Sequence, residues 1–300
     1  MELGTVVDHV PQTPLPKDLS GYEIFTVRFD YRLTDEVLAS APQLRFILSP
    51  TTGLDHIDLK AAEARGISVI SLRGQYEFLR GIWASAEHSW ALLLALVRRL
   101  PRATLAPGQG MWVQRPFFGN ELARKRIGIV GLGRIGEKVA RYAKAFEMKV
   151  YGYDPAPKGN TEGLEMVASL DSLLAQSDVL SIHVPLQEDT RGMIGATELA
   201  RLPAGALLLN TARGAIVDEK ALLAALESGH IAGAAMDVLE GEATAGFPQE
   251  HPLVLYANNH DNVLVTPHIG GATWESRQMT ELFVIGQLAE ALQKGVNNTP

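Results

Sequence analysis

The stretch Ile127-Gly-Ile-Val-Gly131-Leu-Gly133-Arg134-Ile135-Gly136 decides the fold. Its apolar start predicts a buried strand, Ile127–Val130, and the three glycines that follow have the spacing of a dinucleotide-binding turn. The first glycine allows the tight turn, the second lets the backbone approach a pyrophosphate, and the third lets a helix pack closely. We expect an amphipathic helix over Arg134–Met148, whose first N–H groups would bind the phosphates.

An acidic residue lies at the position that distinguishes NAD from NADP in dinucleotide-binding folds. Asp154 follows a second predicted strand, Val150–Tyr153, and lies 18 positions after Gly136. A carboxylate there would accept hydrogen bonds from the adenosine ribose and repel a 2′-phosphate. We therefore expect NAD as the cofactor. The alternative is a glycine turn followed by an incidental surface aspartate.

Strand and helix patterns alternate from Ile127 onward, which is typical of a parallel sheet with helices on both faces. A helix over Glu219–Ser228 is expected to begin at the cap Asp218 and to end at Gly229. The other strands expected in this part of the chain are Val179–Val184, Ala206–Asn210, Ala232–Val238 and Val263–Thr266.

The two ends of the chain predict a second, smaller unit of the same class. Its expected strands are Glu23–Phe29, Leu44–Leu48 and Ser68–Ile70, and its expected helices are Leu59–Arg65, ended by Gly66, and Trp274 to about Lys294. A long helix, Ala84–Leu100, would end before Pro101 and lead into the dinucleotide unit. The expected fold is therefore α/β, with two doubly wound parallel-sheet domains: a Rossmann domain at 99–270, inserted in a flavodoxin-like substrate domain of 1–98 and 271–300.

Composition excludes several classes of protein. The 300 residues include no cysteine, so disulfides, thiolate nucleophiles and cysteine-bound zinc are absent, and we expect no metal site and a cytoplasmic location. The net charge of −7, without a basic stripe, argues against nucleic-acid binding. The most apolar run, Trp90–Val97, is too short to cross a membrane, and Met1–Pro16 lacks the pattern of a signal peptide.

Three side chains at predicted strand ends could together reduce a 2-keto acid. That reaction needs a cation for the carboxylate, a proton donor for the developing alkoxide, and a neighbour that keeps the donor protonated. Arg213, Glu242 and His268 each follow one of the last three predicted strands. Taken singly, they could be a surface arginine, a solvated acid and a structural histidine. The carboxyl edge of a parallel sheet would bring them together.

From about Leu44 to Thr273 the chain resembles the D-isomer-specific 2-hydroxyacid dehydrogenase family, which includes phosphoglycerate, glycerate and D-lactate dehydrogenases. The resemblance implies a reversible, NAD-linked conversion of a small D-2-hydroxy acid to its 2-keto acid. The matching segments, in the family's order, are Gly53-Leu-Asp-His-Ile-Asp-Leu-Lys-Ala-Ala, Ala86-Glu-His, Ile127 to Gly136, His183-Val-Pro-Leu, Asn210-Thr-Ala-Arg-Gly, Ala234-Ala-Met-Asp-Val and Thr266-Pro-His-Ile-Gly-Gly.

The resemblance also implies roles. Arg213 would bind the substrate carboxylate and keto oxygen, His268 would exchange the proton, and Glu242 would favour the imidazolium form of His268, with Glu240 as the rival acid. Asp237 would meet the nicotinamide carboxamide. The backbone N–H groups of Thr52 and Gly53 would meet the substrate. The remaining cofactor contacts implied are His183, Val184, Pro185, Thr190, Thr211, Ala212, Arg213, His268 and Gly270.

Several alternatives stay open. Formate or phosphite oxidation uses the same scaffold, although Glu242 argues against it, and a corepressor-like protein would use NAD as a switch. Arg73 and Arg80, beside a loop at 75–81 that we expect to shape substrate choice, would bind a second anionic group or lie in a solvated loop. The segment Trp112–Phe118 is unusually aromatic for a domain connection, and the resemblance to this family implies that it packs across a homodimer interface. Closure is expected by hinges near Ala84–Leu100 and Ile269–Thr273.

Overall fold

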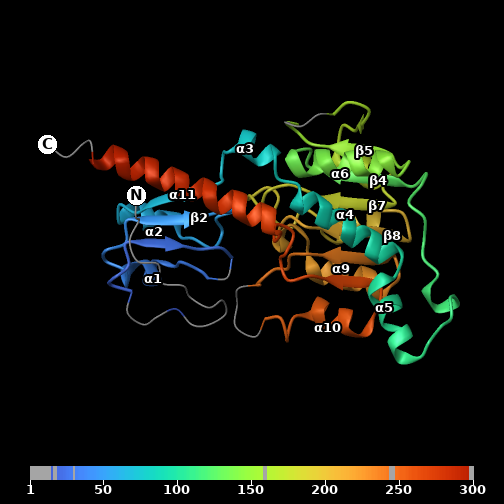
Figure 1. Cartoon of the computed structure of the whole chain (residues 1–300). Helices are drawn as coiled ribbons and strands as arrows, with labels where there is room; N and C mark the ends of the chain where they lie inside the picture. The colour runs from blue at the N-terminus through green and yellow to red at the C-terminus, as the bar shows by residue number, and fades with distance from the viewer. Residues whose placement is uncertain (1–14, 16–18, 30, 158–160, 243–246, 297–300) are drawn as a thin grey trace. The chain divides into compact units, whose positions relative to one another are not determined.

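The computed structural model describes residues 15, 19–29, 31–157, 161–242 and 247–296. By their internal contacts they form two compact units (Figure 1). The smaller unit comprises Met1–Leu79 with Trp274–Pro300, and the larger unit comprises Arg80–Thr273. The expectation for Met1–Pro16 falls almost wholly outside the described residues. Among the described helices, none has the length and hydropathy that crossing a bilayer requires.

The larger unit contains a parallel sheet with the strand order of a dinucleotide-binding fold. Its seven strands run in the order β10-β9-β8-β7-β4-β5-β6, so the chain starts in the middle, moves outward to β6, and returns to the other side of β4. Ligands of such sheets bind where the order reverses, here between β4 and β7. The strands are β4 (Arg126–Val130), β5 (Lys149–Tyr153), β6 (Glu165–Met166), β7 (Val179–Ile182), β8 (Ala206–Asn210), β9 (Ile231–Met236) and β10 (Val263–Val265).

Helices cover both faces of this sheet, which explains why its strands are apolar without alternation. Leu208 packs in the core cluster that includes side chains of α7–α10, and its neighbour Leu209 packs in the opposite cluster, with α4 and α6. The helices are α4 (Ala84–Val97), α5 (Leu100–Leu105), α6 (Arg134–Ala145), α7 (Leu170–Leu174), α8 (Ala196–Arg201), α9 (Glu219–Glu227) and α10 (Pro252–Asn259). The prediction of α/β architecture is confirmed.

Some predicted boundaries in the larger unit differ from the structure. The strands expected to reach Val184 and Val238 end two residues earlier, because the chain leaves the sheet there to form loops at its carboxyl edge. The single helix expected over Ala84–Leu100 is wrong at its end: α4 stops at Val97, and Arg99 adopts a left-handed conformation with φ of 50°. Pro101 then lies in the first turn of α5, where a missing N–H is tolerated.

The contact-based division of the chain comes before α4, whereas the sequence-based boundary lay after it, at 98/99. The reason is the apolar face of α4. Trp90, Leu93 and Leu96 belong to the core cluster of the larger unit, and α4 contacts α6, β8, β9 and β10.

The smaller unit is built on three parallel strands in the order β1-β2-β3. Helix α11 packs against β2 and β3. Residues 76–80, expected to be part of a loop, form the short helix α3. Its Phe78 stacks on Phe283 of α11 with ring centroids 4.1 Å apart. The elements are β1 (Ile24–Thr26), α1 (Asp35–Ala39), β2 (Phe46–Ser49), α2 (Leu59–Ala64), β3 (Ser68–Ser71), α3 (Tyr76–Arg80) and α11 (Trp274–Val296).

Candidate active site

The glycine turn between β4 and α6 has the shape that a bound pyrophosphate requires. Gly131 has φ of +88°, and a Cβ there would lie 2.8 Å from the backbone of His183. A Cβ at Gly136 would lie 2.1 Å from the carbonyl oxygen of Gly131. A Cβ at Gly133 would meet nothing within 4 Å, so protein packing leaves space at the second glycine. Gly133 caps α6 without a side-chain hydrogen bond, which leaves the helix N-terminus suited to an anion.

Asp154 is fixed at the carboxyl end of β5. Its Oδ2 accepts a hydrogen bond from the backbone N–H of Leu132 at 2.8 Å, and its Oδ1 accepts one from Ala156 at 2.8 Å. Because each carboxylate oxygen has two lone pairs, the half-buried group can still accept bonds from ribose hydroxyls. Together, the glycine turn and Asp154 fit NAD.

The loop after β7 meets the glycine turn where the strand order reverses. His183 is half-buried, and its Nε2 lies 2.8 Å from the hydroxyl of Ser181. Burial lowers the pKa of the His183 imidazole to about 3, so the ring is neutral at physiological pH. The hydroxyl of Thr190 donates to the carbonyl of Pro185 at 2.7 Å and accepts from Gln187 N–H at 2.8 Å. Thr190 therefore closes this loop.

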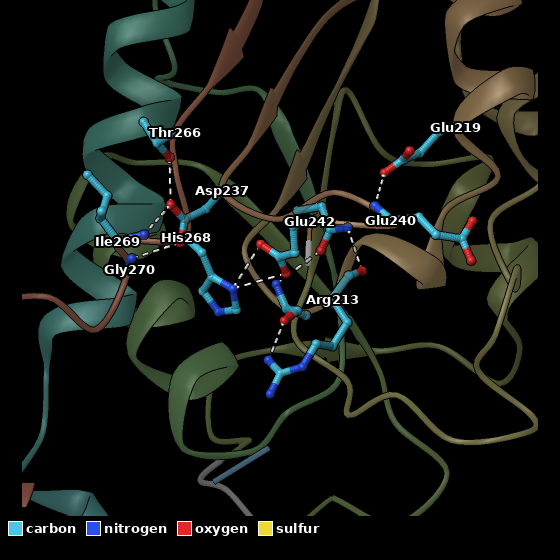
Figure 2. Close-up of polar contacts among 11 residues, drawn as sticks. Arg213, Glu219, Asp237, Glu240, Glu242, Thr266, His268, Ile269 and Gly270 are labelled. Atoms are coloured by element: carbon cyan, nitrogen blue, oxygen red, sulfur yellow. Dashed lines mark hydrogen bonds and ion pairs between the residues drawn. The ribbon is translucent and has the colours of Figure 1, made fainter. Parts of the chain in front are cut away.

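The three candidate catalytic side chains follow the adjacent strands β8, β9 and β10. His268 Nδ1 lies 3.0 and 3.1 Å from the two carboxylate oxygens of Glu242, and the side chains are 18% and 30% exposed. The guanidinium of Arg213 donates through Nη1 to the carbonyl of Ala212 at 2.7 Å. Figure 2 shows the Arg213 side chain extending on the same side as the His268 ring and Glu242. A carboxylate–imidazole pair and a guanidinium group therefore follow three neighbouring strands at one edge of the sheet.

A buried asparagine shapes the turn that carries Arg213. Asn210 Nδ2 donates to the carbonyl of Arg213 at 2.9 Å, and Asn210 Oδ1 accepts from Ala212 N–H at 3.0 Å. The hydroxyl of Thr211 lies 2.7 Å from that of Ser89 on α4. The other predicted cofactor contacts lie at the same edge of the sheet: Arg134 and Ile135 in the first turn of α6, Val184 and Pro185 after β7, and Gly270 after β10.

Asp237 anchors the turn that carries His268. The backbone N–H groups of Ile269 and Gly270 donate to its two carboxylate oxygens at 2.9 and 2.7 Å (Figure 2). The turn holds His268 at φ of +53°, a left-handed conformation that is uncommon outside glycine and is concentrated at functional sites. Burial tends to raise the pKa of Asp237, but hydrogen bonds from His88, Thr266 and Ile269 outweigh it and lower the pKa.

Two partners of Asp237 were missed from the sequence. His88 Nε2 lies 3.1 Å from Asp237 Oδ1, and the hydroxyl of Thr266 donates to the same oxygen at 2.6 Å. His88 lies in the matching segment Ala86-Glu-His, but nothing in that segment indicates which distant residue the histidine contacts.

The remaining predicted site residues are described by their own contacts within each unit. Glu240 is exposed and pairs with Arg191 at 3.4 Å. Thr52 and Gly53 follow β2 in the smaller unit, where the hydroxyl of Thr51 donates to the carbonyl of Gly53 at 2.7 Å. Arg73 is exposed after β3. Within the described part of the chain, no three acidic, histidine or cysteine side chains are grouped to hold a metal ion.

Comparison with known proteins finds a matching family model and similar sequences. The family model described as "D-isomer specific 2-hydroxyacid dehydrogenase, NAD binding domain" matches residues 90–270. The chain is 34% identical to a hydroxypyruvate reductase of Thermotoga maritima, over 97% of this chain and 92% of that protein. It is 38% identical to a D-3-phosphoglycerate dehydrogenase of Archaeoglobus fulgidus, over 94% of this chain. The chain spans about half, 51%, of the length of that dehydrogenase.

A solved structure is also similar over nearly the whole chain. The structure of a D-lactate dehydrogenase of Aquifex aeolicus, complexed with NAD and lactic acid, superposes with a TM-score of 0.77 at 35% identity. The match covers 92% of this chain and 84% of that one. Sequence and fold therefore point to the same group of proteins.

Proposed function

Because this chain belongs to the D-isomer-specific 2-hydroxyacid dehydrogenase family and has its NAD-binding domain, we propose that it interconverts a small D-2-hydroxy acid and the corresponding 2-keto acid. The observation that carries the proposal is the His268–Glu242 pair, with 3.0 Å between Nδ1 and Oε1, at the sheet edge that also carries Arg213. A carboxylate that is hydrogen-bonded to one ring nitrogen fixes the orientation of the imidazole and leaves the opposite nitrogen to exchange a proton.

The chain's own residues would carry out the acid/base part of the reaction. Arg213 binds the substrate carboxylate through parallel hydrogen bonds and orients the keto oxygen. Bound NADH supplies the hydride that the keto carbon accepts. Since His268 Nδ1 faces Glu242, the opposite nitrogen, Nε2, delivers the proton to the keto oxygen and takes it back in the oxidative direction. Glu242 holds the ring's orientation and balances its charge.

The test is oxidation of NADH in the presence of 2-keto acids of increasing size and charge. The panel contains glyoxylate, hydroxypyruvate, pyruvate, branched and aromatic keto acids, and phosphohydroxypyruvate. We expect turnover of at least one compound with a D-hydroxy acid as product. His268→Ala should lower kcat by about 100-fold or more, because general acid–base catalysis contributes roughly 10²–10⁴-fold.

The control is His260→Ala, which removes an exposed histidine whose ring Nδ1 lies 2.9 Å from the carbonyl of Tyr256 in α10. Its kcat should match that of the unmodified protein. Tight NADH binding without turnover of any keto acid would contradict the proposal. If His268→Ala were as active as the unmodified protein, His268 would not be the proton donor.

Three further assignments stay predictions. Thr52, Gly53 and Arg73 are proposed to contact the substrate, so Arg73→Ala should raise KM for phosphohydroxypyruvate more than KM for pyruvate if Arg73 binds a second anionic group. A homodimer and a cytoplasmic location are also proposed.

A further inference from the structure

Glu219 connects two points of the chain on either side of Glu242. Its Oε1 accepts a hydrogen bond from the backbone N–H of Glu240 at 2.8 Å (Figure 2). Its Oε2 lies 2.9 Å from Nε2 of His251, which caps α10. The Glu219 and His251 side chains are only 11% and 12% exposed. One buried carboxylate therefore holds the backbone two residues before Glu242 and the side chain nine residues after it.

Helix capping does not account for this carboxylate. Asp218 already caps α9, and its side chain accepts from the N–H groups of Lys220 and Ala221. An acid in the first turn of a helix is stabilised by the helix dipole while it remains in solvent. Glu219 is instead turned inward, and burial raises the pKa of its carboxyl group while the bonds from Glu240 and His251 oppose that effect.

Gly214 packs closely against the same backbone. A Cβ at Gly214 would lie 2.0 Å from the carbonyl carbon of Leu239 and 2.2 Å from the nitrogen of Glu240. Gly214 directly follows Arg213, and the short turn Gly214–Ile216 leads through Asp218 to Glu219. The peptide between Leu239 and Glu240 therefore has two close neighbours, Gly214 and the Glu219 carboxylate.

We propose that Glu219 is a positioning residue, which holds the 239–242 backbone so that the Glu242 carboxylate meets His268 Nδ1. The proposal rests on the proposed function for the role of Glu242, but the bond from Glu219 to Glu240 can be tested without turnover. His251 secures the second oxygen of Glu219, which fixes the plane of the carboxylate. Because Gly214 packs against the same peptide, the backbone before Glu242 also contacts the turn that carries Arg213.

Two substitutions of Glu219 distinguish the length of its side chain from the charge of its carboxylate. Glu219→Asp keeps the charge and suits a helix N-terminus, but it withdraws the carboxylate by about 1.5 Å, one carbon–carbon bond. Glu219→Gln keeps the length and an oxygen that can accept from Glu240 N–H. Its amide can donate to His251 Nε2, which moves the ring proton to Nδ1. That buried atom has no hydrogen-bond partner, so some stability is lost.

The first measurement is hydrogen exchange of the Glu240 amide, followed in a peptide that spans residues 239–242. We expect faster exchange in Glu219→Asp and near-normal protection in Glu219→Gln. The matched control is Glu198→Asp, in which another carboxylate that accepts a backbone N–H, from Gly195 at 3.1 Å, is shortened in the first turn of α8. It should leave exchange at Glu240 unchanged.

The second measurement is steady-state kinetics with the best keto acid. Glu219→Asp should lower kcat by about 10- to 100-fold with little change in KM or NADH affinity, because a misplacement of about 1 Å can cost that much. Glu219→Gln should stay within about threefold of the unmodified protein. Equal exchange at Glu240 in both variants, or a loss of kcat in Glu219→Gln that exceeds the loss in Glu219→Asp, would overturn the proposal.

The exchange result also separates this proposal from the proposed function. If no keto acid is turned over but Glu219→Asp still deprotects Glu240, the proposed function fails while the anchoring by Glu219 stands. If turnover is normal in Glu219→Asp, the positioning role fails while the proposed function stands.

Discussion

The imidazole Nε2 of His88 lies 3.1 Å from Asp237 Oδ1, which ties α4 to the turn that carries His268. The same nitrogen lies 3.1 Å from the hydroxyl of Thr266 at the end of β10. Asp237 is 1% exposed and accepts the backbone N–H groups that follow His268. His88 lies 149 positions before Asp237 in the sequence. It therefore supports, through Asp237, the left-handed backbone of the candidate proton donor His268.

We predict that His88→Ala lowers both stability and activity. It removes one donor from a buried carboxylate, which should cost about 1–3 kcal/mol of unfolding free energy. It also loosens the turn at His268, so kcat should fall by about tenfold while the affinity for NADH changes less. Urea unfolding and steady-state kinetics check the two effects. His260→Ala serves as the control, and unchanged kcat in His88→Ala would show that the turn at His268 does not need this histidine.

Elements bounded by strong local signals could be predicted from the sequence. Strand β8 has the predicted bounds, Ala206–Asn210, because an apolar run follows Gly205 and ends in a polar turn. The cap Asp218 was predicted from residue type and neighbours. The short helix α3 was not, because its stacking of Phe78 on Phe283 joins segments about 200 residues apart. Propensity contains no information on such contacts.

Some residues of the candidate site could likewise be predicted from the sequence, and others could not. The ends of parallel strands predicted that Arg213, Glu242 and His268 would share an edge of the sheet. The choice between Glu242 and Glu240 rested on the family resemblance, and in the structure the carboxylate beside His268 belongs to Glu242. The support from His88 and Glu219 depends on long-range packing, which a single sequence does not reveal.

We predict that Asp154→Ala changes cofactor selection. Loss of the carboxylate removes a partner of the ribose hydroxyls and the repulsion of a 2′-phosphate. The Kd for NADH should rise by about tenfold, and the preference for NADH over NADPH should shrink by a larger factor. Fluorescence titration with both cofactors measures this. Asp154→Asn removes the charge but keeps an oxygen that can accept from Leu132 N–H. It therefore distinguishes the effect of the charge on cofactor selection from the effect of the hydrogen bond that holds the glycine turn. An unchanged NADH/NADPH ratio in both variants would contradict the role of Asp154.

We predict that the segment Trp112–Phe118 takes part in a homodimer interface. Trp112 is 88% exposed and Phe118 is 69% exposed, in a stretch where Leu105 and Val113 are also exposed. Aromatic side chains exposed together are typical of an interaction surface. Trp112→Glu should raise the dimer dissociation constant by about 100-fold or more, as expected for a central aromatic residue. Light scattering after size exclusion checks this, and a monomer for the unmodified protein would refute it.

We predict that His183 makes the protein less stable in mild acid. The folded state keeps this ring neutral down to about pH 3, whereas the unfolded chain protonates it near pH 6.5. Between these values the unfolded state binds more protons, so stability falls as pH decreases below 6.5, by at most about 2 kcal/mol at pH 5. In His183→Gln this part of the pH dependence should disappear. Urea unfolding at pH 7.5 and pH 5 measures the difference, with His260→Gln as the control that keeps it. The same loss of stability in His183→Gln as in the unmodified protein would mean that the folded protein accepts a proton on His183 as readily as the unfolded chain.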